Sequence, residues 1–426
     1  MTAPAARARL AAERVARSSY GRLVALLAAR GGDLAAAEDA LGDAFAAAMD
    51  HWPREGVPDR PEAWLLTAAR RRLLDGHRRR ATSAQAAPEL LRRAALPEDP
   101  AELPDHRLAL LLACAGEEVE PAARAPLMLQ AVLGLEAARI ASAFLVAPAA
   151  MGQRLVRAKR RLKEGGARFA LPGPEVLADR LPAVLDAIYA AYAAGAGDPA
   201  DGGALAGEAA WLARLCALLV PVGAAEESEA LGLGALLLHL EARRPAGRDA
   251  TGGYVPLAQQ DPARWDRGMQ AEAEGLLRRA ATLGRPGRYQ WEAAIASAHA
   301  ERGRTGRVPW DGILALYDVL LAATGSPVVA VNRAVALAEV AGPAAGLAAL
   351  RAAGADPRLA DYQPYWAALG ALARRAGAPE GRAALERAAG LADDPALRAF
   401  LLRQARADPD QVESPDRVKM LAKSED

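Results

Sequence analysis

The sequence predicts an all-α protein. Alanine and leucine dominate the chain, aromatic residues make up only 4% of it, and β-branched residues are sparse, a composition that favours helices. Apolar residues recur at helical spacing along most of the chain, and Gly, Pro or a capping Asp stands at the breaks. With 426 residues the chain exceeds the usual size of one compact core, so we expect two or three helical domains.

Composition and motifs exclude several classes of protein. The chain is 52% hydrophobic and 25% charged, which is typical of a globular protein and not of a disordered one. The N-terminus has no sustained apolar core, and no apolar run approaches the roughly 20 residues that span a bilayer. We therefore expect a cytoplasmic protein with no membrane partner.

The residues that carry catalytic or metal chemistry form no recognisable constellation. The five histidines form no HExxH pattern, and no Gly-rich phosphate loop follows a strand. The two cysteines, Cys114 and Cys216, sit in apolar helical patterns and are expected to be buried free thiols, since no disulfide framework or zinc spacing is present. The sequence predicts no enzymatic activity, no cofactor and no metal.

The first expected domain covers residues 10–80. Three leucines at helical spacing predict a helix that stops at Gly31 and Gly32, and Asp33 is a good N-cap for the helix after it. Prolines and a glycine predict a loop over 53–61, and Pro61 opens a helix that runs to 80. A proline-bearing linker with a short helical patch at 89–95 is expected over 81–105.

A second expected domain covers 106–164 and ends in a basic helix. Before that helix the chain breaks at Ala147 and Pro148, and a shorter helix precedes the break, so the segment has the form of a helix-turn-helix. One face is predicted to be buried by residues at i, i+4, i+7 and i+11, namely Met151, Leu155, Ala158 and Leu162. This leaves an outer face formed by Gly152, Gln153, Val156, Arg157 and Arg160.

Base recognition is the function that this outer face favours. Gln153 and Arg157 have the side chains that pair with adenine and guanine in a major groove. The basic residues that would neutralise phosphates are Arg154, Lys159, Arg160, Arg161 and Lys163. The formal net charge is only +1, yet basic residues crowd two segments, 70–80 and 154–163, so we expect contact with a polyanion at two places. The alternative is an ordinary helical hairpin with solvated basic faces.

Residues after 164 predict a long helical array. A segment rich in Pro and Gly at 165–175 is the expected linker, and helices with short turns fill 176–410, followed by a polar tail at 411–426. Two-helix units of roughly 34 residues suggest a TPR-like array with a concave surface for a partner. The segment 248–265 interrupts the helices and is expected to be an inserted loop.

Taken together, these segments resemble one bacterial family. "DLAAAEDALGDAFAAAMDHWP" and "VPDRPEAWLLTAARRRLLDGHRRR" resemble region 2 of the extracytoplasmic-function (ECF) sigma factors of RNA polymerase. Segment 108–163 is similar to their region 4, and no region 3 lies between. Residues 176–410 resemble the TPR-like C-terminal extension of one subgroup, so the resemblance covers roughly 15–410.

The resemblance implies roles for individual residues. The acidic helix would dock on the clamp helices of the polymerase's largest subunit through Glu38, Asp39 and Asp43. The loop at 53–60 would hold a flipped base of the minus-ten promoter element. The residues implied in minus-ten binding are Arg60, Trp64, Arg70, Arg71, Arg72, His77, Arg78 and Arg79. The residues implied in minus-35 binding are Gly152, Gln153, Arg154, Val156, Arg157, Arg160 and Arg161.

The same resemblance implies the function and its partners. The protein would bind core RNA polymerase through its clamp helices and flap, read promoter DNA and start transcription, with the extension as a fused regulator. A contact between the extension and the sigma regions is compatible with this fusion. The chain departs from the family at Gly42–Asp43, where Gln-Glu is common, at Arg71, where Asn is frequent, and at 191–199, where Asn-Glu-Gly-Tyr is usual. Two alternatives stay open: a TPR-type adaptor, and a helix-turn-helix repressor, which would need a two-fold dimer.

Overall fold

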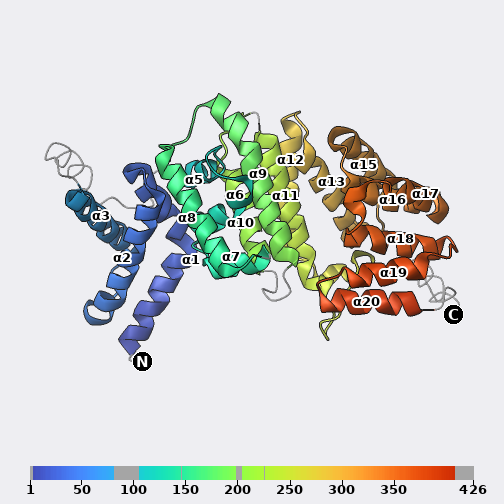
Figure 1. Ribbon diagram of the computed structural model, residues 1–426, viewed down its shortest axis with the longest axis horizontal. Coiled ribbons are helices and arrows are strands. Elements are labelled where there is room, and N and C mark those ends of the chain that lie inside the picture. Colours follow the sequence, from blue (N-terminus) through green and yellow to red (C-terminus); the bar gives the residue numbers. More distant parts are fainter. Residues whose placement is uncertain (1–2, 81–104, 145, 198–203, 225, 408–426) are drawn as a thin grey trace. The chain divides into compact units, whose positions relative to one another are not determined.

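The structure, a computed structural model, describes residues 3–80, 105–144, 146–197, 204–224 and 226–407 (Figure 1). Throughout this part of the chain the regular elements are helices, and one isolated bridge joins Arg248 to Tyr254. The predicted all-α fold is therefore confirmed. The expected patch at 89–95 and the tail at 411–426 lie outside the described residues.

The chain divides into two compact units. Unit 1 contains the residues up to Gly195 together with Ala204–Leu212 and Leu218–Glu226, and unit 2 contains Ala213–Ala217 and the residues from Glu227 onward. The expected linker at 165–175 lies inside unit 1, because the helix that follows it belongs to that unit. The helices of unit 1 are α1 (Ala3–Gly31), α2 (Leu34–Glu55), α3 (Pro61–Arg80), α5 (Arg107–Cys114), α6 (Pro121–Leu133), α7 (Ala137–Ala143), α8 (Pro148–Glu164), most of α9 (Pro174–Gly197) and part of α10 (Ala204–Leu219).

Local signals set the start and end of α2. The Asp33 carboxylate accepts a hydrogen bond from the backbone N–H of Ala36 at 3.1 Å, which is the predicted N-cap. The predicted loop start at Pro53 is wrong, since α2 continues through this proline and ends at Glu55, with Gly56 as its C-cap at a φ of +93°. A proline this close to a helix end removes only one intrahelical donor, whereas a positive φ favours glycine strongly.

Helix α1 is buried on every side at its centre. The six consecutive residues from Leu23 to Ala28 are each at most 3% exposed. A helix that is apolar all round must be enclosed by other elements, and α1 packs against α2 and α3 as well as against α5 and α6. The N-terminal block, α1–α3, and the α5–α8 block therefore share a continuous core.

Helix α8 presents the predicted apolar stripe to that core. Pro148 occupies the first turn and Ala147 is the N-cap. The four stripe residues, Met151, Leu155, Ala158 and Leu162, are all buried. The helical period was enough to predict this face because α8 packs on one side only, against α7, α6 and α2.

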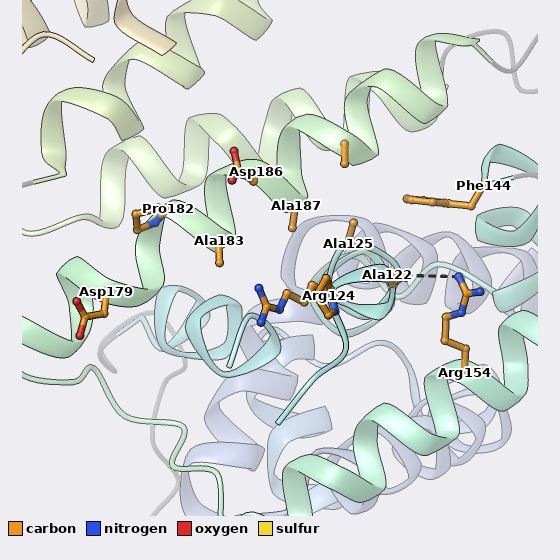
Figure 2. A pocket seen from close by; sticks show the side chains of 12 residues that line it. Ala122, Arg124, Ala125, Phe144, Arg154, Asp179, Pro182, Ala183, Asp186 and Ala187 are labelled. Atoms are coloured by element: carbon orange, nitrogen blue, oxygen red, sulfur yellow. Dashed lines mark hydrogen bonds between the residues drawn. The ribbon is translucent and has the colours of Figure 1, made fainter. Parts of the chain in front are cut away.

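A cleft of about 520 Å³ lies within unit 1 between α6, α8 and α9. Figure 2 shows Ala183 and Ala187 of α9 opposite Ala125 and Arg124 of α6, with Phe144 at one end. The guanidinium of Arg107 stacks on the indole ring of Trp211 in α10, 5.4 Å from its centroid. The first helices of the expected extension thus contact the α5–α8 block.

Unit 2 is a succession of helices, each packed on the next in sequence from α15 to α20. This neighbour-to-neighbour order is the one expected of stacked helical pairs. The helices are α11 (Glu227–Arg243), α12 (Arg267–Thr282), α13 (Arg288–Ala300), α14 (Arg302–Thr305), α15 (Trp310–Thr324), α16 (Pro327–Ala341), α17 (Pro343–Ala353), α18 (Gln363–Arg375), α19 (Gly381–Gly390) and α20 (Pro395–Arg406).

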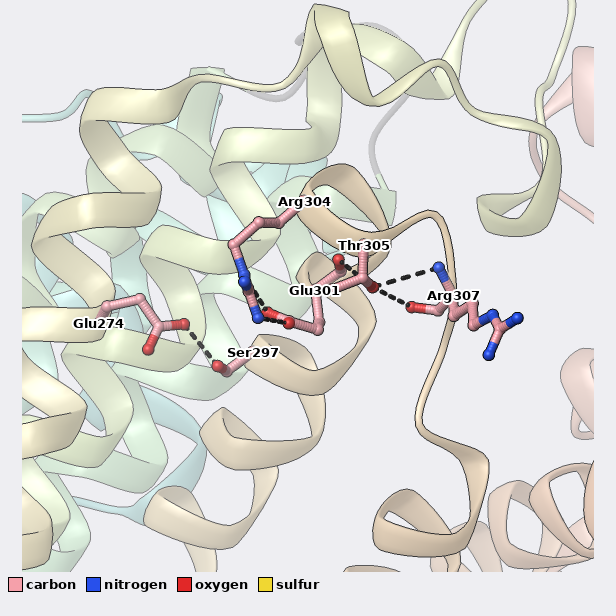
Figure 3. A network of polar contacts seen from close by, with 6 residues as sticks. All are labelled: Glu274, Ser297, Glu301, Arg304, Thr305 and Arg307. Atoms are coloured by element: carbon pink, nitrogen blue, oxygen red, sulfur yellow. Dashed lines mark hydrogen bonds and ion pairs between the residues drawn. The ribbon is translucent and has the colours of Figure 1, made fainter.

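Polar contacts fix the joints between the first helices of unit 2. Figure 3 shows the Ser297 hydroxyl of α13 donating to the carboxylate of Glu274 in α12. The Thr305 hydroxyl accepts from the backbone N–H of Arg307 at 3.2 Å and so closes the turn after α14. These hydrogen bonds satisfy polar backbone and side-chain groups at the connections between consecutive helices.

The segment 248–265 is an ordered connection, held mainly through its own backbone. Arg302 donates to the carbonyl oxygens of Ala258 and Gln260, the second at 2.6 Å. At the far end of unit 2, Arg248 forms an ion pair with Asp394 at 2.6 Å, and the ring of Tyr254 lies 5.3 Å from that of Phe400. The expected inserted loop therefore ties the beginning of unit 2 to α20.

Candidate polymerase-binding and DNA-binding surfaces

The three acidic residues of α2 lie in different environments. Asp39 is exposed. Asp43 is also exposed and lies 3.5 Å from Arg72 of α3 in an ion pair. Glu38 is only 11% exposed at its side chain and is paired with Lys159 of α8, itself 15% exposed. Only Asp39 and Asp43 are therefore presented to a partner in this state.

Burial controls the charge of Glu38. Removal from water raises the pKa of its carboxyl above the ordinary value, and the nearby Lys159 ammonium opposes this rise. The Oε1 atom of Glu38 is buried without a hydrogen-bond partner, so Lys159 satisfies only one of the two carboxylate oxygens. The pKa of Tyr20 is also raised, mainly by burial and further by the charges of Glu38 and Asp39.

The segment predicted to bind the minus-ten element leaves some of its side chains on the surface. Arg60, Arg71 and Arg72 are exposed. Trp64 is half-buried and packs edge-on against Trp52, with ring centroids 5.6 Å apart. The side chains of His77, Arg78 and Arg79 lie outside the described part of the chain, so their predicted contacts stay predictions.

Arg70 requires a correction. Its side chain was expected to follow the DNA backbone, yet the residue is only 6% exposed. It lies on the helix face that also carries the buried Leu66, because residues four positions apart share a side of α3. A long run of arginines on a helix cannot all face solvent, and the period of the buried residues decides which one turns inward.

The outer face of α8 is available to a ligand in its N-terminal half. Gln153, Arg157 and Val156 are exposed, the last at 68%. Gly152 and Arg154 are half-buried, and Arg154 points a guanidinium nitrogen at the carbonyl of Ala122, 3.5 Å away (Figure 2). The exposed trio combines a bifunctional amide, a cation and an apolar group, which is what base edges in a major groove can recognise.

The C-terminal half of α8 is engaged in ion pairs. Arg160 pairs with Glu164 at 3.7 Å, and Arg161 pairs with Glu120 at 2.9 Å. Lys159, which was expected to neutralise a phosphate, pairs with Glu38 of α2, and Lys163 pairs at 2.8 Å with Asp33, the N-cap of that helix. Lys159 is 15% exposed and Lys163 is 56% exposed, so only the first is largely covered by its partner carboxylate. The phosphate contacts of both lysines stay predictions.

Among the described residues, no group of three or more His, Cys, Asp or Glu side chains is placed to hold a metal ion. Within the same residues, the helices lack the length and apolar character needed to cross a membrane. Cys114 and Cys216 are free thiols and both are buried, as predicted.

The sequence analysis did not predict the residues at which the N-terminal block, α1–α3, contacts the α5–α8 block. Gly21 of α1 lies directly against the backbone of Val132 in α6, and Tyr20 packs on Gly134 at the end of α6. The one available signal was the unbroken apolar run from Leu23 to Ala28, which is too long for a helix with a solvent-facing side.

Comparisons with known proteins agree with the N-terminal part of this description. Residues 15–83 match the family Sigma-70 region 2, and residues 180–281 match a family of unknown function (DUF6596). Uncharacterized protein R00370 of Rhizobium meliloti (strain 1021) is 37% identical over 381 residues, covering 86% of this chain and 89% of its own. No solved structure matches the chain. The chain belongs to one family with that Rhizobium protein. The Sigma-70 region 2 match at its N-terminus supports a sigma-70 family factor.

Proposed function

We propose that the protein is an ECF-type sigma factor that binds core RNA polymerase and directs transcription from specific promoters. The observation that carries this proposal is the Sigma-70 region 2 match over 15–83, which covers most of α1 and all of α2 and α3. A sigma factor accelerates no covalent step itself. The free energy for opening promoter DNA would come from binding bases and polymerase, with no hydrolysis.

The two expected DNA contacts would divide between the blocks. In the N-terminal block, Arg60, Arg71 and Arg72 are exposed cations beside the short loop 56–60, where a flipped minus-ten base would be held. In the α5–α8 block, the short α7, a turn and α8 would act as a helix-turn-helix at the minus-35 element. Gln153 and Arg157 would read base edges there, and Val156 would meet a thymine methyl group.

The extension would regulate these activities in place of a separate protein. Its neighbour-packed helices support a TPR-like array that presents a surface to a partner, and its α10 already contacts Arg107 of the α5–α8 block through Trp211. The residues matched to DUF6596, 180–281, include Trp211 of this contact. The protein would act in the cytoplasm, where polymerase and promoter DNA are.

Run-off transcription tests this proposal. Purified core polymerase and the full chain are incubated with the DNA upstream of the chain's own gene. The wild type should produce a discrete transcript, and the double variant Gln153→Ala, Arg157→Ala should lower its yield at least about tenfold, since each base contact is worth about 1–3 kcal/mol.

The matched control is Arg168→Ala, which removes one exposed positive charge just beyond α8 and should leave the yield unchanged. If the control lowers transcription as much as the double variant, the effect is general charge attraction and not base reading. An absence of any transcript together with an absence of core binding would favour the adaptor alternative.

A further inference from the structure

The cleft between α6, α8 and α9 has the size of a site for a small organic molecule. Its volume is about 520 Å³, and pockets that hold such molecules typically have about 300–1,000 Å³. Its walls are mainly apolar, with Ala125 of α6 opposite Ala183 and Ala187 of α9 and the ring of Phe144 at one end (Figure 2). Walls of this kind bind the apolar body of a ligand by removing its surface from water.

Two arginine side chains line the same cleft, and few of their donors are used. Arg124 of α6 donates through Nε to the carbonyl oxygen of Val119 at 3.2 Å. Arg154 of α8 reaches the carbonyl oxygen of Ala122 at 3.5 Å, which is long for a hydrogen bond. Both residues are half-buried, and within the described part of the chain neither is paired with a carboxylate. Because a guanidinium group has five N–H donors, most of them remain for a ligand or for water.

The charges in the cleft favour an anionic ligand. Asp179 and Asp186 of α9 also line the cleft, but both are exposed. The carboxylate of Asp179 lies at the end opposite Phe144 and Arg154 (Figure 2), so solvent screens it from the guanidinium group there. A half-buried guanidinium without a carboxylate partner gains most from an anion, because a charge-assisted hydrogen bond is about twice as strong as a neutral one.

We propose that this cleft binds a small amphipathic organic anion, with its apolar body between α6 and α9 and its carboxylate or sulfonate group held by Arg124 and Arg154. The site is separate from Gln153 and Arg157, which do not line the cleft. Arg154 is also among the residues implied in minus-35 binding, so a bound anion would occupy a side chain that a DNA phosphate needs. This consequence rests on the proposed sigma function, whereas the binding of the anion does not.

Fluorescence titration of the full chain with anilinonaphthalene sulfonate, an aromatic sulfonate that emits strongly in apolar surroundings, tests the binding. The probe should bind saturably, and decanoate should displace it. Decyltrimethylammonium has the same chain length and the opposite charge, and it should need a concentration at least about tenfold higher, since charge-assisted hydrogen bonds to the arginines are lost. Equal displacement by the two compounds would show that apolar contact alone is at work and would overturn the anion site.

Substitution of one arginine tests the head-group contact. Arg124→Gln should weaken binding of both the probe and decanoate about tenfold, because an amide replaces a charged donor. The matched control is Arg168→Gln, which removes an exposed arginine that does not line the cleft and should leave both affinities unchanged. Equal losses in the two variants would reflect general charge attraction and would overturn the role of Arg124.

A second pair of variants tests the location of the site. Ala190 and Ala193 are both exposed alanines of α9, but only Ala190 lines the cleft. Since neither is buried, a glutamate at either position should leave the core intact. Ala190→Glu should weaken binding of decanoate at least about tenfold, because the new carboxylate competes for the arginines and repels the anion, and Ala193→Glu should match the wild type. Unchanged binding by Ala190→Glu would place the ligand elsewhere on the molecule and overturn the cleft as its site.

Run-off transcription with and without saturating decanoate tests the consequence for DNA. Decanoate should lower the transcript yield of the wild type and of Ala193→Glu, but not that of Ala190→Glu. An equal effect on all three chains, or no effect on the wild type, would overturn the competition with DNA. If none of the chains starts transcription even without decanoate, the proposed sigma function falls, whereas the displacement measurements still decide whether the cleft binds the anion.

Discussion

Glu38 and Lys159 show how burial changes what a charged side chain contributes. Taking the carboxylate out of water disfavours its charged form, and the ammonium beside it restores part of that loss. A half-buried pair of this kind adds little net stability, yet loss of one partner leaves the other buried and uncompensated. The pair therefore specifies which face of α2 meets α8 more than it strengthens the fold.

The contact between the Tyr20 ring and Gly134 can be tested by substitution. Its φ of +68° ends α6, and the Tyr20 ring leaves no room for a Cβ. Gly166 has nearly the same conformation, φ +66°, but open space around it. Gly134→Ala should lower the free energy of unfolding by about 2 kcal/mol and Gly166→Ala by about 1 kcal/mol, since both strain the backbone and only the first also meets Tyr20.

Urea denaturation of the full chain, followed by the tyrosine and tryptophan signals of unit 1, measures both changes. Equal losses for the two variants would mean that the Tyr20 ring moves aside at no cost. The contact between α1 and the end of α6 would then be weaker than its geometry indicates.

Single elements were predicted well where one local rule governed them. The Asp33 cap and the four buried residues of α8 follow from capping chemistry and from the helical period. The inward turn of Arg70 and the pairing of Lys159 with Glu38 could not be predicted in this way. Lys159 and Glu38 are 121 positions apart in the chain. Residue spacing within one helix does not indicate which distant helix its basic side chains will contact.

The packing of α13 against α15 makes the stability of unit 2 depend on pH. His299 is packed against Trp310 with ring centroids 5.3 Å apart, and burial, aided by the charges of Arg243 and Arg302, lowers the pKa of its imidazole to about 4. The unfolded chain has an ordinary histidine, with a pKa near 6.5. Between these values the unfolded state binds more protons, so stability is full above about pH 6.5 and falls as the pH drops toward 4.

Scanning calorimetry of the full chain at several pH values checks this expectation. The melting temperature of the transition assigned to unit 2 should fall between pH 6.5 and 4, and His299→Gln should flatten that slope. His51→Gln, on an exposed part of α2, serves as the control and should leave the slope as it is. An unchanged slope in His299→Gln would assign the pH dependence to other groups.

At the scale of the whole molecule, the two compact units of the structure do not coincide with the domains predicted from the sequence. Composition placed a boundary at 165–175, but α9 and part of α10 complete unit 1. The family match at 180–281 spans residues of both units. A Pro- and Gly-rich segment marks a turn in the backbone, whereas a compact unit is defined by which apolar faces are buried together, and those faces come from both sides of the turn.

The proposed sigma function is tested most directly by a titration of labelled full chain with purified core polymerase in the absence of DNA. Binding should be saturable. Asp39→Ala should weaken it about tenfold, or about 1.4 kcal/mol, while Asp50→Ala, at another exposed carboxylate of α2, should have no effect. The absence of binding by the wild type would contradict the sigma function, and equal effects of the two aspartate changes would contradict docking through Asp39.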